Sequence, residues 1–271
     1  YEQFGSTHNT EFTMIEWYRS PGRLEEIMDD TEELFKHVAK ALDIHRLKYR
    51  DKEIEIMEKW DRKSMRELWQ EYVGVDLDDY VMTMHPSVIA RNEAISSVGS
   101  LELESEEFKR IKKNLKELCQ KLGHQTSDDD EYEDLFFKIF LNKIEPNLGR
   151  DRPIFVYDYP AGMCSLSKLC ESDSRYAQRF ELYIGGLEIA NAFGELTDAA
   201  EQKKRLEKDR DLRTKLGKET WPVDADFIEA LNDIKQETAG IALGVDRMVL
   251  LFTGAKDLNE VIFQAVKDQI D

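Results

Sequence analysis

Two glutamates in one short segment have the residue type and spacing to hold a metal ion. The segment 180–190 predicts a β-hairpin, because the Gly-Gly pair at its centre is a two-residue turn signal. In such a hairpin Tyr183 lies opposite Glu188 and Glu181 lies opposite Ala190, so both carboxylates share one face. Like charges on one face repel unless a cation lies between them, and Mg²⁺ is often held by one or two carboxylates. An exposed hairpin in an acidic protein would give the same pattern, so both interpretations stay open.

A second candidate site lies near the start of the chain. β-Branched and aromatic residues partly alternate over 10–18 (TEFTMIEWY) and predict a strand. Period-two geometry places four of its side chains on one face: Phe12, Met14, Glu16 and Tyr18. An aromatic ring can stack on a nucleotide base, and a carboxylate can hold an ammonium group. His8 and Asn9, in the loop before the strand, could reach the edge of an adenine. Ordinary sheet contains similar mixtures, so this segment alone is ambiguous.

The third candidate is an arginine between two glycines and a long apolar stretch. In Gly240 to Phe252 (GIALGVDRMVLLF), two glycines four residues apart allow close backbone approach where a strand feeds a helix. Arg247 falls in the first turn of that helix, where its guanidinium could clamp a phosphate. The apolar flanks argue against a solvent-exposed arginine. An arginine paired with a structural carboxylate would fit the same pattern.

The elements that must position these residues are short strands separated by helices. Apolar spacing predicts a helix over 24–42, an acidic run at 127–134 predicts the start of another, and a third is predicted over about 198–216. Residues 154–157 are typical of a buried strand, and 46–150 are otherwise polar and mostly helical in pattern. This order predicts an α+β fold with an antiparallel sheet flanked by helices.

Composition and charge limit the classes of function. The 271 residues are 41% apolar and 35% charged, a soluble globular balance without an apolar run long enough to span a membrane. No signal peptide is visible, and three cysteines without metal spacing favour reduced thiols in a cytoplasmic protein. With 38 Lys and Arg against 56 Asp and Glu, the net charge is −18. The basic footprint of a nucleic-acid-binding protein is therefore not evident.

Three segments in this order resemble the lysine type of class II aminoacyl-tRNA synthetases. His8 to Tyr18 is similar to the second half of motif 2, Gln178 to Gln202 to the amino-acid and metal region, and Gly240 to Phe252 to motif 3. The resemblance covers nearly the whole chain. It implies one catalytic domain over 1–271, truncated at its N-terminus so that motif 1 and the start of motif 2 are missing, with a mostly helical insertion at about 46–145.

The resemblance implies a role for each matching residue. The ATP-binding residues would be Glu2, His8, Asn9, Phe12, Glu181, Glu188 and Arg247. The residues that bind the lysine-type substrate would be Glu16, Tyr18, Asn191, Glu195, Ala242 and Gly244. Catalysis would rest on Arg247, Glu181 and Glu188, and the two glutamates would hold Mg²⁺.

Within that group the chain resembles the stand-alone ligases that attach (R)-β-lysine to a lysine of elongation factor P. The features that favour them are EWY at 16–18, the segment 145–160, the end of the chain from 254, and Ala242 where the synthetases usually carry glycine. The implied activity is ATP-dependent formation of an aminoacyl adenylate and its transfer to elongation factor P. The alternatives are a lysine–tRNA ligase, with lysine as substrate and tRNA as acceptor, and a non-catalytic paralogue that acts as a binding module.

The resemblance has three further implications. It predicts a homodimer at full length, a cytoplasmic location and no membrane partner. Because the motif 2 arginine would lie just before Tyr1, we expect the 271-residue chain to be inactive or nearly so. The segment after Leu77 looks like an extra insertion and receives no role.

Overall fold

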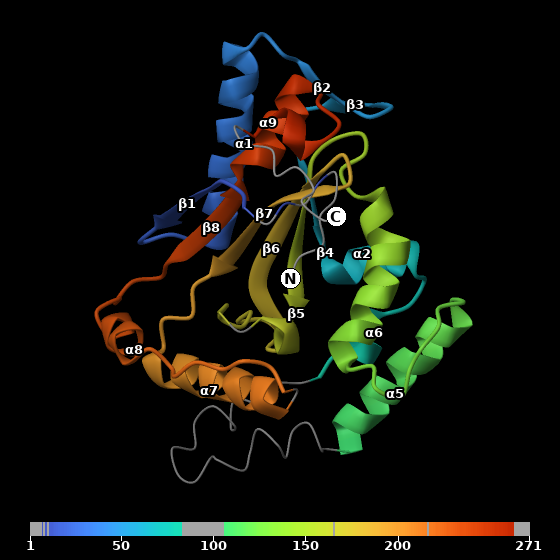
Figure 1. Cartoon of the computed structure of the whole chain (residues 1–271), viewed down its shortest axis with the longest axis vertical. Coiled ribbons are helices and arrows are strands. Elements are labelled where there is room, and N and C mark those ends of the chain that lie inside the picture. The colour runs from blue at the N-terminus through green and yellow to red at the C-terminus, as the bar shows by residue number, and fades with distance from the viewer. Residues whose placement is uncertain are drawn as a thin grey trace, which may run out of the picture.

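A six-stranded sheet forms the centre of the protein (Figure 1). The computed structural model describes Thr7, Asn9 and residues 11–82, 106–164, 166–215 and 217–262. In spatial order the strands are β1 (Met14–Arg19), β8 (Ala239–Gly244), β7 (Leu187–Gly194), β6 (Tyr176–Ile184), β5 (Ile154–Pro160) and β4 (Asp61–Ser64). All neighbours are antiparallel except β4 and β5, which are parallel. The predicted α+β class is confirmed, and the parallel pair makes the sheet mixed.

One face of the sheet is covered along its length. It packs against α1 (Leu24–Ala41), α9 (Val245–Thr253) and a small hairpin of β2 (Arg46–Tyr49) and β3 (Lys52–Glu55), and together they form the first core. The predicted first helix is confirmed, since Ile27 and Phe35 of α1 are fully buried against the sheet. Helix α9 is followed by Gly254, whose left-handed backbone (φ 70°) forms its C-cap.

Among the described residues, the cover of the opposite face lies over β5 and β6. Here α2 (Met65–Tyr72), α5 (Glu106–Lys121) and α6 (Tyr132–Ile139) form a second core with the sheet (Figure 1). Its centre is aromatic: Phe136 stacks on Trp69 at 5.1 Å between ring centroids and on Phe140 at 6.2 Å. Each such buried ring contributes about 1.5–3 kcal/mol by leaving water.

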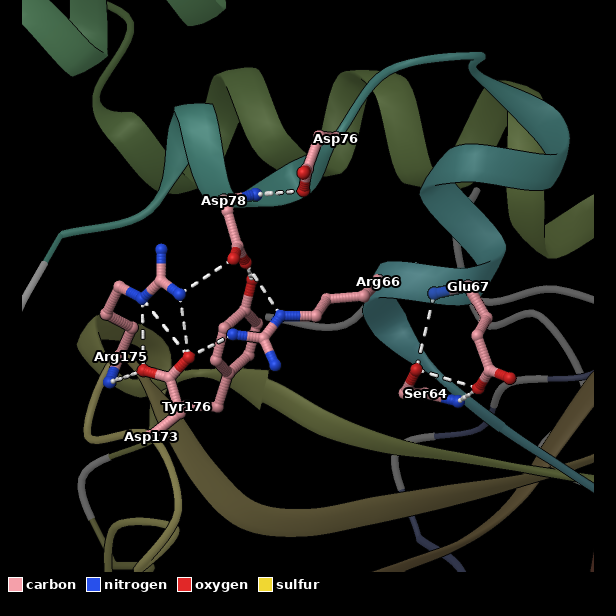
Figure 2. Close-up of polar contacts among 8 residues, drawn as sticks. All are labelled: Ser64, Arg66, Glu67, Asp76, Asp78, Asp173, Arg175 and Tyr176. Atoms are coloured by element: carbon pink, nitrogen blue, oxygen red, sulfur yellow. Dashed lines mark hydrogen bonds and ion pairs between the residues drawn. The ribbon is translucent and has the colours of Figure 1, made fainter.

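A polar network joins this helical cover to the sheet (Figure 2). Asp78, in the 3₁₀ turn Leu77–Tyr80, accepts hydrogen bonds from Arg66 of α2 (2.7 Å), Arg175 (2.7 Å) and the Tyr176 hydroxyl (2.7 Å). Asp173 accepts from both arginines, and the Arg66 guanidinium lies 4.0 Å from the centroid of the Tyr176 ring. The network therefore ties α2 and the following turn to the start of β6.

The β6–β7 hairpin forms as predicted, with one difference in register. Gly185 and Gly186 both have positive φ (64° and 81°), as a two-residue type I′ turn requires. Tyr183 lies opposite Glu188, as expected. Glu181, however, lies opposite Asn191 and not Ala190, because a β-bulge shifts the register between Leu182 and Tyr183. The extra residue turns Ala190 to the covered face, where it joins the first core.

Residues 46–64 are where the expectation of helix is wrong. They form β2, β3 and β4, and β4 is an edge strand of the central sheet. The charged residues that suggested helix alternate with buried Leu47, Tyr49 and Ile54, a period of two rather than 3.6.

The predicted helix near 198–216 is confirmed as α7 (Ala199–Lys215), which α8 (Ala225–Leu231) follows. The remaining turns are η2 (Phe140–Ile144, π-helical) and the 3₁₀ turns η3 (Glu145–Asn147), η4 (Ala161–Met163) and η5 (Leu258–Glu260). None of the helices among the described residues combines the length and apolar character that a membrane span needs.

Candidate active site

In the part of the chain that the structure describes, no helix of the second core lies over β1, β8 and β7, and this open part of the second face is the candidate active site. Along β8, the buried side chains of Ile241 and Leu243 point to the first core. Gly240, Ala242 and Gly244 therefore face the second side of the sheet, and because these residues are small they leave a shallow surface, called the floor below. The side chains that stand around this floor are placed there by the strand registers: Met14, Glu16, Tyr18, Arg179, Glu181, Tyr183, Glu188, Asn191, Phe193.

A cavity of about 330 Å³ opens on this floor. That volume lies at the lower end of the range for small-molecule sites, about 300–1,000 Å³. Seven of the predicted site residues line the cavity: Asn9, Phe12, Glu188, Asn191, Ala242, Gly244 and Arg247. Two further ATP-binding candidates, Glu2 and His8, lie outside the described residues.

The loop before β1 and the start of α9 form one end of this cavity. Arg247 donates hydrogen bonds to the carbonyl oxygen of Glu188 (2.6 Å) and to that of Thr7 (3.2 and 3.3 Å). The backbone N–H of Thr13 donates to Asp246 at 2.7 Å, and this contact fixes the loop on the helix. More than half of the Phe12 ring is exposed (55%), so its face is available to a planar ligand. This end therefore offers a guanidinium and an aromatic ring, which suit a phosphate chain and a base.

Glu181 lies beside the cavity in a closed set of hydrogen bonds. Its carboxylate is 6% exposed and accepts from the hydroxyls of Tyr159 (2.5 Å) and Tyr183 (2.6 Å) and from Arg179 (2.5 Å). Arg179 also donates to the side-chain oxygen of Asn191 at 3.1 Å. A carboxylate has about four acceptor positions, so one remains on the oxygen that faces Arg179. Tyr159 and Arg179 are not among the site residues predicted from the sequence, although strand alternation places Arg179 on the face of Glu181.

Glu188 carries a charge that its surroundings do not balance. Burial and the nearby charge of Glu181 raise the pKa of Glu188 to about 7, although Arg247 and Arg179 act in the opposite direction. Burial, and then Glu181, also raise the pKa of Glu145, a carboxylate of the turn after α6 that the sequence analysis gave no role. A cation would relieve this surplus of negative charge.

Mg²⁺ fits these residues in its ligand chemistry. It usually keeps several waters and needs only one or two protein carboxylates, which Glu188 and the remaining position on Glu181 would supply. Among the described residues no group of three or more His, Cys, Asp or Glu side chains forms a protein-only metal site. Magnesium binding by Glu181 and Glu188 thus stays a prediction.

The other end of the uncovered floor is suited to an ammonium group. Burial raises the pKa of Glu195 to about 7, and burial followed by Glu195 and Glu16 raises that of Tyr18. A Cβ on Gly240 would lie 2.4 Å from the Tyr18 ring and 2.6 Å from a carboxylate oxygen of Glu195, so both side chains stand directly over this glycine. Glu16 lies opposite Ala242 on the same face. Gly240 was missed as a site residue, although its place two residues before Ala242 puts it on the same floor.

The fold and this site define a class: the chain belongs to the family of class II tRNA synthetases (D, K and N), whose model matches residues 1–267. The resemblance seen in the sequence is thereby confirmed at the level of the family. The roles of individual site residues stay predictions, because the comparison covers whole chains.

Curated relatives are proteins named elongation factor P–(R)-β-lysine ligase. The protein from Histophilus somni (strain 2336) is 33% identical over 261 residues, which are 96% of this chain and 67% of the relative. That from Pectobacterium atrosepticum is 32% identical over 268 residues, 98% of this chain and 68% of the relative. The protein from Yersinia enterocolitica is 34% identical over 263 residues, which are 96% of this chain and 67% of the relative.

Proposed function

We propose that this chain is the catalytic part of an ATP-dependent ligase that activates a lysine-type amino acid, (R)-β-lysine, and transfers it to a lysine of elongation factor P. The observation that carries the proposal is the pair of chemically different ends on one floor. One end has Phe12 and Arg247 for a nucleotide, and the other has Glu195 and Tyr18 for an ammonium group. The names of the relatives support the choice of acceptor.

The first step would join the amino acid to the nucleotide. A carboxylate oxygen of the amino acid attacks the α-phosphorus of ATP, and the bond from that phosphorus to the oxygen bridging to the β-phosphate breaks, releasing pyrophosphate. Glu195 and Tyr18 would hold the side-chain ammonium, Phe12 would stack on the base, and Arg247 would bind the γ-phosphate. Mg²⁺ on Glu188 and Glu181 would supply charge neutralisation of the phosphates.

The second step would transfer the acyl group. The neutral amine of the acceptor lysine attacks the acyl carbon, the bond to the phosphate oxygen breaks, AMP leaves, and the new amide nitrogen loses a proton. No covalent enzyme nucleophile is needed, because positioning and charge neutralisation carry such reactions. All three cysteines are buried, and burial raises the pKa of Cys119 and Cys164 to about 11, so neither is suited to act as a nucleophile.

A lysine–tRNA ligase is the second candidate function, because the family model includes the lysine enzymes. Its acceptor would be tRNA, whose phosphates favour a basic surface. The net charge of −18 favours the protein acceptor. The third alternative, a non-catalytic paralogue, would bind substrates without turning them over. The homodimer, the cytoplasmic location, the inactivity of the 271-residue chain and the insertion at about 46–145 also stay predictions.

The test uses the full-length protein. ATP–pyrophosphate exchange is measured with (R)-β-lysine and with L-lysine, and acyl transfer is then measured with elongation factor P and with tRNA. We expect faster exchange with (R)-β-lysine and transfer only to elongation factor P. Preference for L-lysine with charging of tRNA would establish the second candidate, and binding of either amino acid without any exchange would establish the third.

A further inference from the structure

Arg179 lies between two of the site residues and contacts both. Its side chain is 14% exposed, and its guanidinium lies 4.5 Å from the centroid of the Tyr159 ring. One arm donates to Glu181 at 2.5 Å, and the Nε–H donates to the side-chain oxygen of Asn191 at 3.1 Å. Glu181 and Asn191 are direct partners across β6 and β7, so one arginine spans a pair that the strand register brings together.

The chemistry of the guanidinium decides which way the Asn191 amide faces. Arginine has five N–H donors and no acceptor, so the atom it faces at hydrogen-bond distance must be the amide oxygen of Asn191. The NH₂ group of the same amide then faces away from Arg179. Asn191 lines the cavity, so the group that it offers there is a donor.

We propose that Arg179 is a positioning residue. By binding the oxygen of the Asn191 amide, it presents the NH₂ of Asn191 to the cavity, and this end of the cavity then selects a ligand with an acceptor oxygen, such as a carboxylate. The proposed function enters only through the probe, since lysine is the carboxylate-bearing ligand chosen. Glu181 holds the guanidinium in place through its second arm.

A lysine in place of Arg179 would keep the charge but not the arrangement. Its ammonium is a point donor on a flexible stem, whereas the planar fork of arginine reaches two acceptors in a fixed geometry. Arg179→Lys is therefore expected to leave Glu181 paired and the Asn191 amide free to turn over.

The first measurement is a double-mutant cycle on L-lysine affinity, by calorimetry with the full-length protein. We expect Arg179→Lys to weaken binding about tenfold, the effect of one lost hydrogen bond. In an Asn191→Ala background the same change should weaken binding less than about twofold. Equal weakening in both backgrounds, or none in either, would overturn the proposal. The matched control is Arg205→Lys: that side chain is also 14% exposed and donates to Glu201 and to the carbonyl oxygens of Cys164 and Ser167, not to Glu181 or Asn191.

A second variant leaves Arg179 untouched. Asn191→Asp keeps the shape and an oxygen for Arg179 but replaces the NH₂ donor by a carboxylate oxygen. We expect L-lysine affinity to fall about 100-fold and the affinity for lysinol, which has a hydroxyl in place of the carboxylate, to fall less than about threefold. An equal fall for both probes would contradict the assigned direction of the amide.

The third measurement needs no ligand. In nitrogen-15 NMR, the Nε–H of Arg179 should exchange with solvent at least about ten times faster in Asn191→Ala than in the wild type. Unchanged exchange would overturn the inference. This measurement does not depend on binding. A protein that binds neither L-lysine nor (R)-β-lysine would therefore refute the proposed function, while the exchange rate would still decide which way the Asn191 amide faces.

Discussion

Carboxylates in the two halves of the second sheet face have pKa values shifted in opposite directions. In the half covered by α2, α5 and α6, hydrogen bonds from Tyr176, Arg66 and Arg175 outweigh burial and lower the pKa of Asp78. Hydrogen bonds from the same arginines hold the pKa of Asp173 well below its usual range. In the open half the pKa values of Glu188 and Glu195 are raised to about 7.

This difference teaches where the sequence serves folding and where it serves binding. A carboxylate that meets arginines of its own chain stabilises the fold, whereas one that is half-buried without enough positive charge is a cost to the fold and a place for a cation. Glu181 is intermediate between these two kinds of carboxylate, because Arg179 and two tyrosines of its own chain occupy most of its acceptor positions.

The largest effect is expected from filling the open floor with Gly240→Ala. The added methyl group would overlap the Tyr18 ring and the Glu195 carboxylate, so both must move away from the ammonium position. We expect lysine affinity to fall about 100-fold, with little loss of stability, because the Tyr18 ring is mostly exposed and can shift. Calorimetry and thermal unfolding measure the two effects. Gly162→Ala is the control, since no atom lies within 4 Å of its added methyl group.

In the covered half, Asp78→Asn should destabilise the protein by about 2 kcal/mol. The change leaves two arginines and the Tyr176 hydroxyl with a weaker partner. Because the folded pKa of Asp78 is lowered, its contribution is present above pH about 4 and is lost as the pH falls further. Urea unfolding at pH 7 measures the loss. Asp128→Asn removes a fully exposed carboxylate that pairs with Lys116 and should leave the unfolding midpoint unchanged; an equal loss there would remove the contrast.

A third expectation concerns the pH dependence of binding in the open half. Because the pKa of Glu195 is raised to about 7, the ionised form that attracts an ammonium group disappears below that pH. Lysine affinity should fall about tenfold between pH 8 and pH 6. Glu195→Gln should bind weakly at both pH values and show no such slope. A slope that persists in this variant would assign the titration to another group.

The smallest expected effect is that of Glu195→Gln on stability, which has the opposite sign to that of Asp78→Asn. Between pH 4.5, the ordinary pKa of Glu195, and about pH 7, the folded state binds more protons than the unfolded state. The destabilisation that ionised Glu195 causes therefore grows as the pH rises through this window. Glu195→Gln should therefore stabilise the protein at pH 8 by about 1 kcal/mol, after allowance for partial exposure, and hardly at pH 5. Thermal unfolding at both pH values measures this. Destabilisation at pH 8 would show that Glu195 is held by its own chain.

The sequence predicted features that depend on local rules. Alternation, the Gly185-Gly186 pair and the apolar spacing of the first helix sufficed for the hairpin, for β1 and for α1, and the family resemblance named seven residues that line the cavity. The bulge was missed because its mark in β7 is small: Ile189 and Ala190 are consecutive apolar residues that both join the first core, and alanine is common on either face of a strand. Arg179 and Gly240 were missed for another reason, since their importance lies in what stands across the sheet from them.

The bulge opposite Tyr183 has a consequence for how the protein tolerates change. Tyr183 pairs with Glu188 before the bulge, and Leu182 pairs with Ala190 after it, so Ile189 is the residue without a partner on the facing strand. Because partners across a ladder share a face, removing Ile189 would leave Asn191 on the floor and Ala190 in the first core. A deletion further along β7 would instead reverse the facing of the residues beyond it. The bulge therefore gives β7 one position at which it could lose a residue without turning its binding side chains over.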